Sequence, residues 1–236
     1  MIVKGGKAVA GASLGILMLD AQFPRIPGEV GNAQTWDFPV HYKIVRGASP
    51  QRVVKERAVG LLDPFIEAGR ELIAMGADGI TTNCGFLSLF QAELAEALAV
   101  PVAASSLMQV PLVQTLLPPG KRAGVLTISA DSLTPDHLRG AGVLLDTPVI
   151  GCDPDGEFAR VIIGNELELD VEKARADLVR AARMLRENTP DLGAIVLECT
   201  NMPPYSADIR EAAGVPVFGM DTFICWFQAG LAPRRW

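Results

Sequence analysis

The feature that most constrains the fold of this chain is a repeat that relates its two halves. When Cys84 is aligned with Cys199, an isoleucine stands four residues before each cysteine, Ile80 in one half and Ile195 in the other. The tripeptide Val-Pro-Val begins sixteen residues after each cysteine. A repeat of this length indicates duplication of a whole folding unit and not a short-period solenoid. It predicts two similar lobes, each carrying a cysteine at the equivalent position.

Short apolar runs alternate with amphipathic segments in both halves. Buried strands of a parallel sheet appear as continuous apolar runs, whereas residues 170–188 carry apolar side chains on one helical face. We expect a second helical stretch, 50–77, to be broken near Asp63–Pro64, because proline interrupts helices. The alternation predicts an α/β fold with helices covering parallel sheets. The strands are expected at 13–19, 79–82, 100–105, 123–129, 194–198 and 215–220.

The duplication divides the chain into two pseudo-symmetric α/β lobes, each a parallel sheet flanked by helices. We expect the first lobe over 1–118 together with 218–236, and the second over 119–217. Ligands of open α/β sheets bind beyond the carboxyl ends of the strands. Both cysteines follow such an end, so the active site is predicted in the cleft between the lobes. The loop 23–32, rich in proline and glycine, is expected to cover this cleft.

The composition excludes several classes of partner. Of 236 residues, 49% are hydrophobic and 20% are charged, which is enough apolar material for a buried core. The net charge of −6 offers no basic surface for nucleic acid or for an anionic membrane. No apolar run approaches the length of about 18 residues that a membrane span needs. The apolar stretch 14–19 is short and has no cleavage site after it, so we expect a cytoplasmic protein.

The four cysteines are widely spaced, as is typical of free thiols in a reducing compartment. Cys152 is expected in a loop after a strand and Cys225 on an apolar helix face, both without a catalytic role. A cysteine at a strand end is often a small buried hydrophobe, which is the alternative for the other two. Core filling does not explain why both halves keep the sulfur among polar neighbours. We therefore interpret Cys84 and Cys199 as catalytic.

No metal or cofactor motif accompanies these cysteines. There is no Cys-x-x-Cys pair, and His41 and His137 lie in different segments without the spacing of zinc ligands. The early glycines fit neither a phosphate-binding loop nor a dinucleotide fingerprint. Neither cysteine segment contains a lysine that would hold pyridoxal phosphate. We therefore expect no metal site and no cofactor, with the chemistry carried by side chains and backbone.

The segments TTNCGF and LECTNMPPY, together with an opening strand that ends at Asp20, resemble the aspartate/glutamate racemase superfamily. The resemblance covers essentially the whole chain. It implies two pseudo-symmetric α/β lobes with the active site between them. The superfamily contains cofactor-independent amino acid racemases, hydantoin racemases, maleate cis–trans isomerases and arylmalonate decarboxylases.

The resemblance implies two-base chemistry at a carbon beside a carboxylate or carbonyl group. One cysteine, as thiolate, removes a proton, and the other, as thiol, delivers a proton to the opposite face. An ordinary thiol has a pKa of about 8.5, so the thiolate needs stabilisation of the kind a helix N-terminus gives. The enolate-like intermediate needs preorganised donors. The backbone N–H groups that follow each cysteine are the expected donors.

The resemblance also implies which residues contact the substrate. Asp20 matches an acidic residue that lies close to the first cysteine in amino acid racemases, and its alternative role is to cap the following turn. Thr127 and Ser129 stand at the equivalent point of the second lobe, where Ser129 alternatively caps a helix. The predicted catalytic residues are Cys84 and Cys199, and the predicted substrate-binding residues are Asp20, Asn83, Gly85, Phe86, Thr127, Ser129, Thr200 and Asn201.

Three departures from the superfamily's motifs narrow the range of possible substrates. Asn201 stands where glutamate racemases have a histidine, and Glu198 replaces the glycine before the second cysteine, which argues against glutamate. Gly85 and Phe86 replace the Asn-Thr of many amino acid racemases. The presence of both cysteines argues against arylmalonate decarboxylase, which keeps only the second.

We therefore expect a cofactor-independent racemase or epimerase that acts on a small amino acid or a hydantoin-like substrate. Two alternatives stay open: a maleate-type cis–trans isomerase with Cys84 as nucleophile, and a non-catalytic two-lobe protein that binds a small ligand. The expected partner is a small carboxylate or carbonyl compound. The aromatic C-terminal segment, from Thr222 on, is expected to pack on the first lobe, with a homodimer contact as the alternative.

Overall fold

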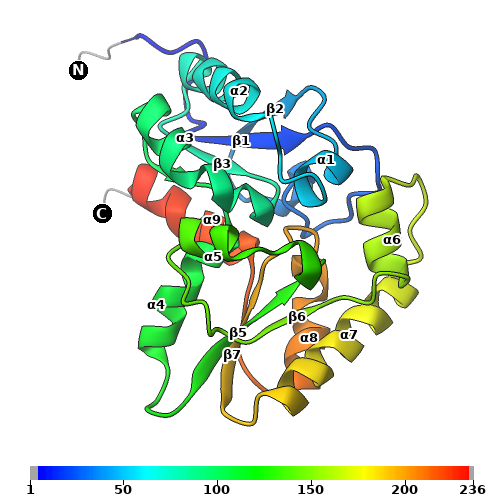
Figure 1. Ribbon diagram of the computed structural model, residues 1–236. Coiled ribbons are helices and arrows are strands. Elements are labelled where there is room, and N and C mark those ends of the chain that lie inside the picture. Colours follow the sequence, from blue (N-terminus) through cyan, green and yellow to red (C-terminus); the bar gives the residue numbers. More distant parts are fainter. Residues whose placement is uncertain (1–4, 234–236) are drawn as a thin grey trace.

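The computed structural model describes residues 5–233, whose strands form two four-stranded parallel sheets (Figure 1). The strand orders are β2-β1-β3-β4 and β6-β5-β7-β8, so the second sheet repeats the order of the first. This equivalence confirms the predicted α/β fold with two similar lobes. The strands are β1 (Leu14–Leu19), β2 (Val40–Val45), β3 (Gly79–Thr82), β4 (Val102–Ala103), β5 (Arg122–Thr127), β6 (Val149–Gly151), β7 (Leu192–Leu197) and β8 (Val217–Phe218).

Six of these strands coincide with the predicted apolar runs, and two, β2 and β6, were not predicted. Both lie at a sheet edge, each paired only with β1 or β5. β2 carries His41, Tyr42 and Lys43 in its middle, and every residue of β6 is half-buried. An edge strand is partly exposed and needs no continuous apolar run, which explains why the pattern did not reveal them.

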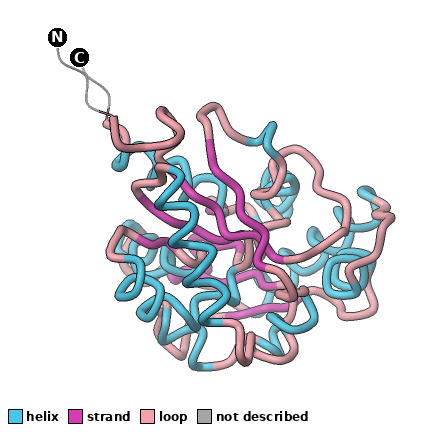
Figure 2. The backbone as a smooth tube through the Cα atoms, turned by 90° about the horizontal axis from the view of Figure 1, so that it is seen from above, coloured by secondary structure: helices cyan, strands magenta, loops and turns pink. Residues whose placement is uncertain are grey.

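Helices surround the strands in both lobes (Figure 2). The clearest predicted helix, α7, buries Ala174, Leu178, Ala181 and Leu185 on one face, as its periodicity predicts. It begins after Asp170, whose side chain accepts from the backbone of Lys173. The helices are α1 (Pro50–Val54), α2 (Leu62–Met75), α3 (Gln91–Leu98), α4 (Gln109–Leu116), α5 (Pro135–Gly140), α6 (Glu157–Gly164), α7 (Val171–Asn188), α8 (Ser206–Ala213) and α9 (Met220–Leu231).

The stretch 50–77 contains two helices, as predicted, but the break is not at Asp63–Pro64. It lies at residues 55–61, between α1 and α2, where Arg57, Ala58 and Gly60 have positive φ. Asp63 and Pro64 stand in the first turn of α2. Proline is tolerated there because its missing N–H would have no partner within the helix.

The two lobes are joined by packing and by hydrogen bonds. Helix α4 packs against β5 and β7, whereas α9, near the end of the chain, packs against β3. One hydrophobic cluster contains core residues of both lobes, such as Leu17 of β1 and Val196 of β7. The hydroxyl of Ser106, which follows β4, donates to the carbonyl oxygen of Leu197 at 2.6 Å. This bond ties the segment after β4 of the first lobe to the end of β7 of the second.

The C-terminal helix packs on the first lobe only in part. In α9, Phe223 and Ile224 are buried, but Trp226 is 63% exposed and stacks on Phe223. The expectation that the segment from Thr222 on packs on the first lobe therefore does not hold for Trp226. Residues 1–4 and 234–236, which belong to the predicted first lobe, lie outside the described residues.

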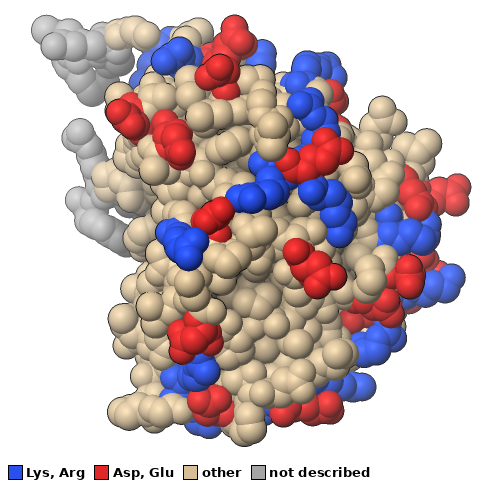
Figure 3. All heavy atoms as spheres, viewed as in Figure 1, with Lys and Arg blue, Asp and Glu red and all other residues tan. Residues whose placement is uncertain are grey.

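The surface carries both signs of charge. On the face in Figure 3, Lys and Arg side chains lie among Asp and Glu side chains. Surface pairs of opposite charge include Arg57 with Asp136. No helix within residues 5–233 combines the length and the apolar character needed to cross a membrane.

Candidate active site

The two repeat cysteines meet at one cavity. Cys84 is the second residue after β3, and Cys199 is the second residue after β7, the equivalent strand of the other sheet. Both line a small cavity of about 20 Å³ between the lobes, and both are less than 10% exposed. A space of this size holds about one water molecule. The predicted placement of both sulfurs at the carboxyl ends of equivalent strands is thus what the structure shows.

Backbone and amide N–H groups point at both sulfurs. Cys84 precedes a 3-10 helix (Gly85–Phe90), and the N–H groups of Phe86 and Leu87 hydrogen-bond to its sulfur. Asn201 donates to the sulfur of Cys199 through its backbone N–H and through Nδ2 at 3.5 Å. Such donors lower a thiol pKa because they stabilise the negative sulfur. The sequence predicted that the N–H groups at Gly85–Phe86 and Thr200–Asn201 stabilise an enolate-like intermediate. Those of Phe86 and Asn201 act on the sulfurs here, and the role toward an intermediate stays a prediction.

Burial nevertheless dominates the ionisation of both thiols. It raises the pKa of Cys84 and of Cys199 well above the ordinary value, and the charge of Glu198 is the second cause in each case. In this small cavity the thiol form is therefore favoured on both sides. A reaction that needs a thiolate must supply either a proton acceptor or a positive charge.

Glu198 is the main residue that sequence reasoning did not assign to the site. It directly precedes Cys199 and is 1% exposed. Its Oε2 accepts from the hydroxyl of Thr127 at 2.7 Å, and burial raises its pKa to about 7. A Cβ at Gly85 would lie 2.3 Å from its Oε1, so the carboxyl group lies directly against the first cysteine segment. The available signal was a charged residue ending an otherwise apolar strand.

Asn83 and Asn201 offer unused polar atoms near the sulfurs. Asn83 accepts from the backbone of Leu19 at 2.8 Å through Oδ1, while its buried Nδ2 has no partner among the described residues. The Oδ1 atom of Asn201 is likewise buried and without a partner in residues 5–233. Thr200 donates to the carbonyl oxygen of Asn83 at 2.5 Å and so links the two cysteine segments. A free amide donor in this lining fits the carboxylate of a ligand.

The other predicted contacts lie further from the sulfurs. Asp20 accepts from the backbone N–H of Gly47 at 3.0 Å and is not part of the cavity lining. Gly47 follows β2, so this bond is not a cap of the turn after Asp20, which was the alternative role. The hydroxyl of Thr127 does not line the cavity but donates to Glu198, which does. The hydroxyl of Ser129 makes no hydrogen bond that caps the short helix after it. As substrate contacts these three residues stay predictions.

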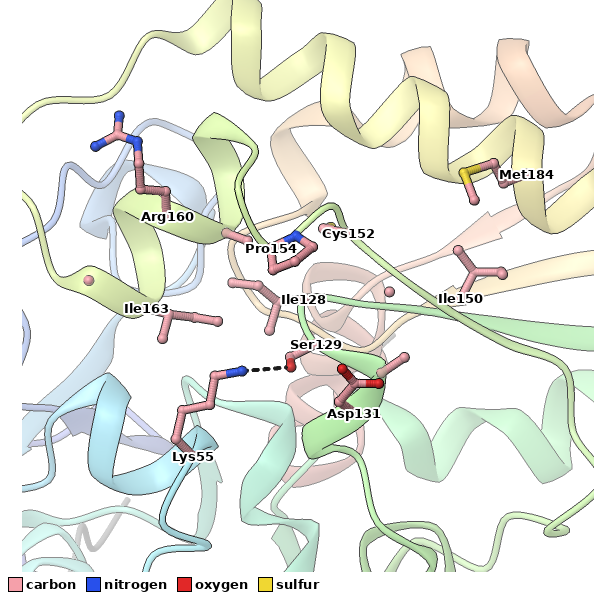
Figure 4. A pocket seen from close by; sticks show the side chains of 14 residues that line it. Lys55, Ile128, Ser129, Asp131, Ile150, Cys152, Pro154, Arg160, Ile163 and Met184 are labelled. Carbon is pink, nitrogen blue, oxygen red and sulfur yellow. Dashed lines mark hydrogen bonds between the residues drawn. The ribbon is translucent and has the colours of Figure 1, made fainter.

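A larger pocket adjoins the cysteine cavity (Figure 4). It has a volume of about 470 Å³, and Ile128 and Ile163 line both spaces, so these two side chains form the shared wall. The Nζ atom of Lys55 donates to the hydroxyl of Ser129 at 3.1 Å inside this pocket. Cys152 also lines it and directly follows β6, which agrees with its expected place in a loop after a strand. A small ligand therefore has a route from this pocket to the sulfurs if the isoleucine wall moves.

The loop 23–32 covers the cavity, as predicted. The side chain of Phe23 lines it, and the guanidinium of Arg25 lies 4.6 Å from the centre of that ring. Arg25 pairs with Glu29, which is 2% exposed and has a pKa that burial raises to about 7. The backbone N–H of Val30 donates to the carbonyl oxygen of Thr200 at 3.4 Å. The loop is thus fixed directly over the second cysteine segment.

The described residues that line the cysteine cavity include no Lys, Arg or His. The ring centres of His137 and Phe86 lie 5.1 Å apart in an edge-to-face arrangement. Burial lowers the pKa of His137 to about 4, so its side chain is neutral at neutral pH. Within residues 5–233 no cluster of three or more His, Cys, Asp or Glu could hold a metal ion. The cavity therefore combines acidic groups with amide donors and carries no positive charge of its own.

Dimethylsulfoniopropionate lyases are similar to this chain over most of its length. A dimethylsulfoniopropionate lyase from Durusdinium sp. clade D is 32% identical over 219 residues, which is 88% of this chain and 71% of that protein. Dimethylsulfoniopropionate lyase 7 from Emiliania huxleyi is 30% identical over 230 residues, 93% of this chain and 67% of that protein. No protein-family model matches the chain.

Solved structures confirm the fold. Unliganded arylmalonate decarboxylase superposes with a TM-score of 0.61 at 19% identity, covering 95% of this chain and 94% of that one. The aspartate racemase of Picrophilus torridus gives a TM-score of 0.58 at 14% identity, covering 95% and 96%. The two-lobed fold of the aspartate/glutamate racemase superfamily, predicted from the cysteine segments, is therefore confirmed.

Proposed function

The chain belongs to the dimethylsulfoniopropionate lyase family, within the aspartate/glutamate racemase superfamily, and we propose that it is itself a lyase for a small β-sulfonium carboxylate. In dimethylsulfoniopropionate, two methylene groups separate a carboxylate from a dimethylsulfonium group. The reaction releases dimethyl sulfide and acrylate. The observation that carries the proposal is the cavity itself: two thiols and a buried carboxyl group, with no cationic side chain in the described lining.

The chemistry begins as in a racemase. A cysteine thiolate takes the proton from the carbon next to the carboxylate, forming an S–H bond. The electron pair of the broken C–H bond forms the carbon–carbon double bond. The C–S bond then breaks, and dimethyl sulfide leaves with its electron pair. The same proton abstraction serves both reaction types, and the leaving group decides which one follows.

The charge of the cavity suits a cationic substrate. A sulfonium group placed beside Glu198 and two thiols favours their ionised forms, because an opposite charge within a few ångströms lowers an acidic pKa. The same surroundings disfavour a dianion such as maleate, which would meet three acidic groups without a counter-charge. The unpartnered Nδ2 of Asn83 is the donor best placed for the single carboxylate.

A racemase or epimerase of a small amino acid or hydantoin is the second candidate. The observation that favours it is the presence of both sulfurs at equivalent positions of the two lobes. Inversion of a carbon centre needs an acid and a base on opposite faces, whereas elimination needs only one base. The second cysteine is thus fully explained by a racemase and only partly by a lyase.

Proton NMR in D₂O separates the candidates. We expect dimethylsulfoniopropionate to yield acrylate, and a panel of D- and L-amino acids and 5-substituted hydantoins to show no exchange of the α-hydrogen. In a lyase, serine at one of the two cysteines abolishes turnover, while serine at the other leaves measurable activity. A racemase loses all exchange in both the Cys84→Ser and the Cys199→Ser variant, and acrylate is absent throughout.

A further inference from the structure

The cavity contains one buried titratable group that the elimination steps above do not use, the carboxyl group of Glu198. It stands at the end of β7, directly before Cys199, and Thr127 holds its Oε2 at 2.7 Å. The positions of its Oε1 and of its own carbonyl oxygen leave no room for a Cβ at Gly85, the residue after Cys84. The side chain therefore reaches from the second lobe to the cysteine segment of the first.

Glu198 is also the charged group that acts most strongly on both reactive thiols. Apart from burial, its charge is the largest cause that raises the pKa of Cys84 and of Cys199, and it acts on Cys152 as well. Glu29 adds negative charge at Cys199 from the covering loop. Lys55 lines the outer pocket, where it donates to Ser129, and Arg25 of the covering loop pairs with Glu29. A thiolate and an ionised Glu198 therefore disfavour each other strongly.

The stoichiometry of elimination requires a proton to leave the site. Each turnover converts one C–H bond into a free proton, and the cysteine that received it must lose it before the next cycle. A racemase has no such requirement, because the second thiol returns a proton to the substrate. In a cavity with room for about one water molecule, the acceptor must be a group in the wall.

We propose that Glu198 is the proton acceptor for the catalytic cysteine, an inference that rests on the proposed lyase function. The S–H bond of the thiol breaks and an O–H bond forms on the carboxylate, which leaves the thiolate that attacks the α-hydrogen. A group that titrates near neutral pH can both accept this proton and release it again.

The hydrogen bonds around Glu198 lead towards the outer pocket. The hydroxyl of Thr127 donates to Glu198 and accepts from the backbone N–H of Ser129 at 3.4 Å, and the hydroxyl of Ser129 meets Lys55 (Figure 4). Glu198 lines the cysteine cavity, and Ile128 and Ile163 separate this cavity from the 470 Å³ pocket. We assign the release of the proton to water in that pocket.

The variant Glu198→Gln tests the assignment, because it keeps the size and the bond to Thr127 but cannot accept a proton. We expect kcat for dimethyl sulfide release to fall about 100-fold or more, in the range typical of general-base removal, with a much smaller rise in KM from the lost charge beside the sulfonium group. In the wild type, kcat/KM rises with pH through about 7 as Glu198 of the free enzyme ionises. In the variant this rise disappears, and activity increases only at alkaline pH, where the thiol ionises unaided.

Two further variants separate this role from a structural one. Glu29→Gln removes a buried carboxyl group of the same raised pKa outside the cavity lining, and it keeps the rise near neutral pH. Glu198→Ala leaves space for a small acid, so added formate restores turnover. A Glu198→Gln enzyme with wild-type kcat, or one with a raised KM and unchanged kcat, overturns the proposal; the latter would assign the residue to substrate binding.

A measurement without substrate keeps the two proposals apart. The ultraviolet absorbance of thiolates, followed against pH, is expected to appear at lower pH in Glu198→Gln than in the wild type, because the repelling carboxylate is gone. Identical titrations would show that the charge of Glu198 does not act on the thiols, which would overturn the proposal. If the wild type releases no dimethyl sulfide, the lyase function is wrong. The thiolate titration then still tests whether the carboxyl group of Glu198 acts on the thiols.

Discussion

At the scale of single residues, the site depends on a glycine as much as on its sulfurs. Gly85 lets the backbone after Cys84 approach Glu198, because an added Cβ would lie 2.3 Å from both the carbonyl oxygen and Oε1 of that residue. Overpacking of this kind costs typically about 1–3 kcal/mol. We expect Gly85→Ala to lower the free energy of unfolding by that amount and turnover by at least about tenfold, measured by urea denaturation and steady-state kinetics.

Gly230→Ala is the matched control for that prediction. Gly230 lies in α9, and a Cβ there has no atom within 4 Å. Replacing a glycine inside an exposed helix stabilises it by roughly 0.5–1 kcal/mol. A Gly85→Ala protein that is as stable and as active as Gly230→Ala would show that the close approach of Glu198 is not needed.

At the scale of elements, a buried hydroxyl group ties the segment after β4 to the end of β7 in the other lobe. Ser106 donates to the carbonyl oxygens of Leu197 and Glu198 at 2.6 and 3.0 Å, which fixes the end of β7. Ser106→Ala leaves these carbonyl groups without that donor, so we expect a loss of about 1–3 kcal/mol of stability. Ser88 is equally buried, but its hydroxyl has no partner in the described chain. Ser88→Ala is therefore expected to cost nothing, and equal losses in urea unfolding would contradict this account.

The strands also show which parts of the fold can and cannot be predicted from the sequence. The central strands are apolar throughout, so the runs ending near Thr82 and Leu197 predicted β3 and β7 and the cysteines after them. The edge strand β2 contains His41 and Lys43, and no periodicity separates it from a loop. Glu198 ends a strand as many surface carboxylates do. Only the packing of the two lobes reveals that it is enclosed.

At the scale of the whole molecule, two buried carboxyl groups make stability depend on pH. The folded state raises the pKa of Glu198 from 4.5 to about 7, so it binds this proton more tightly than the unfolded chain does. The resulting stabilisation is complete below about pH 4.5 and is lost as the pH rises to about 7. Since one pKa unit corresponds to about 1.4 kcal/mol, the change is on the order of 3 kcal/mol.

Glu198→Gln removes this dependence, because an amide does not titrate. Relative to the wild type, the variant should gain on the order of 3 kcal/mol in unfolding free energy between about pH 4 and pH 8. Glu29, with the same direction of shift, still contributes its own dependence in both proteins. Parallel stability curves for variant and wild type would show that Glu198 is not buried as an acid.

The central claim is that the cysteine cavity performs an elimination. The most direct test is headspace gas chromatography of dimethyl sulfide released from dimethylsulfoniopropionate by the purified protein, with acrylate counted in the same vial. We predict equal amounts of both products, and loss of both in the double variant Cys84→Ser/Cys199→Ser. No dimethyl sulfide from the wild type, together with α-hydrogen exchange in an amino acid or hydantoin that the double variant lacks, would contradict the claim and identify a racemase.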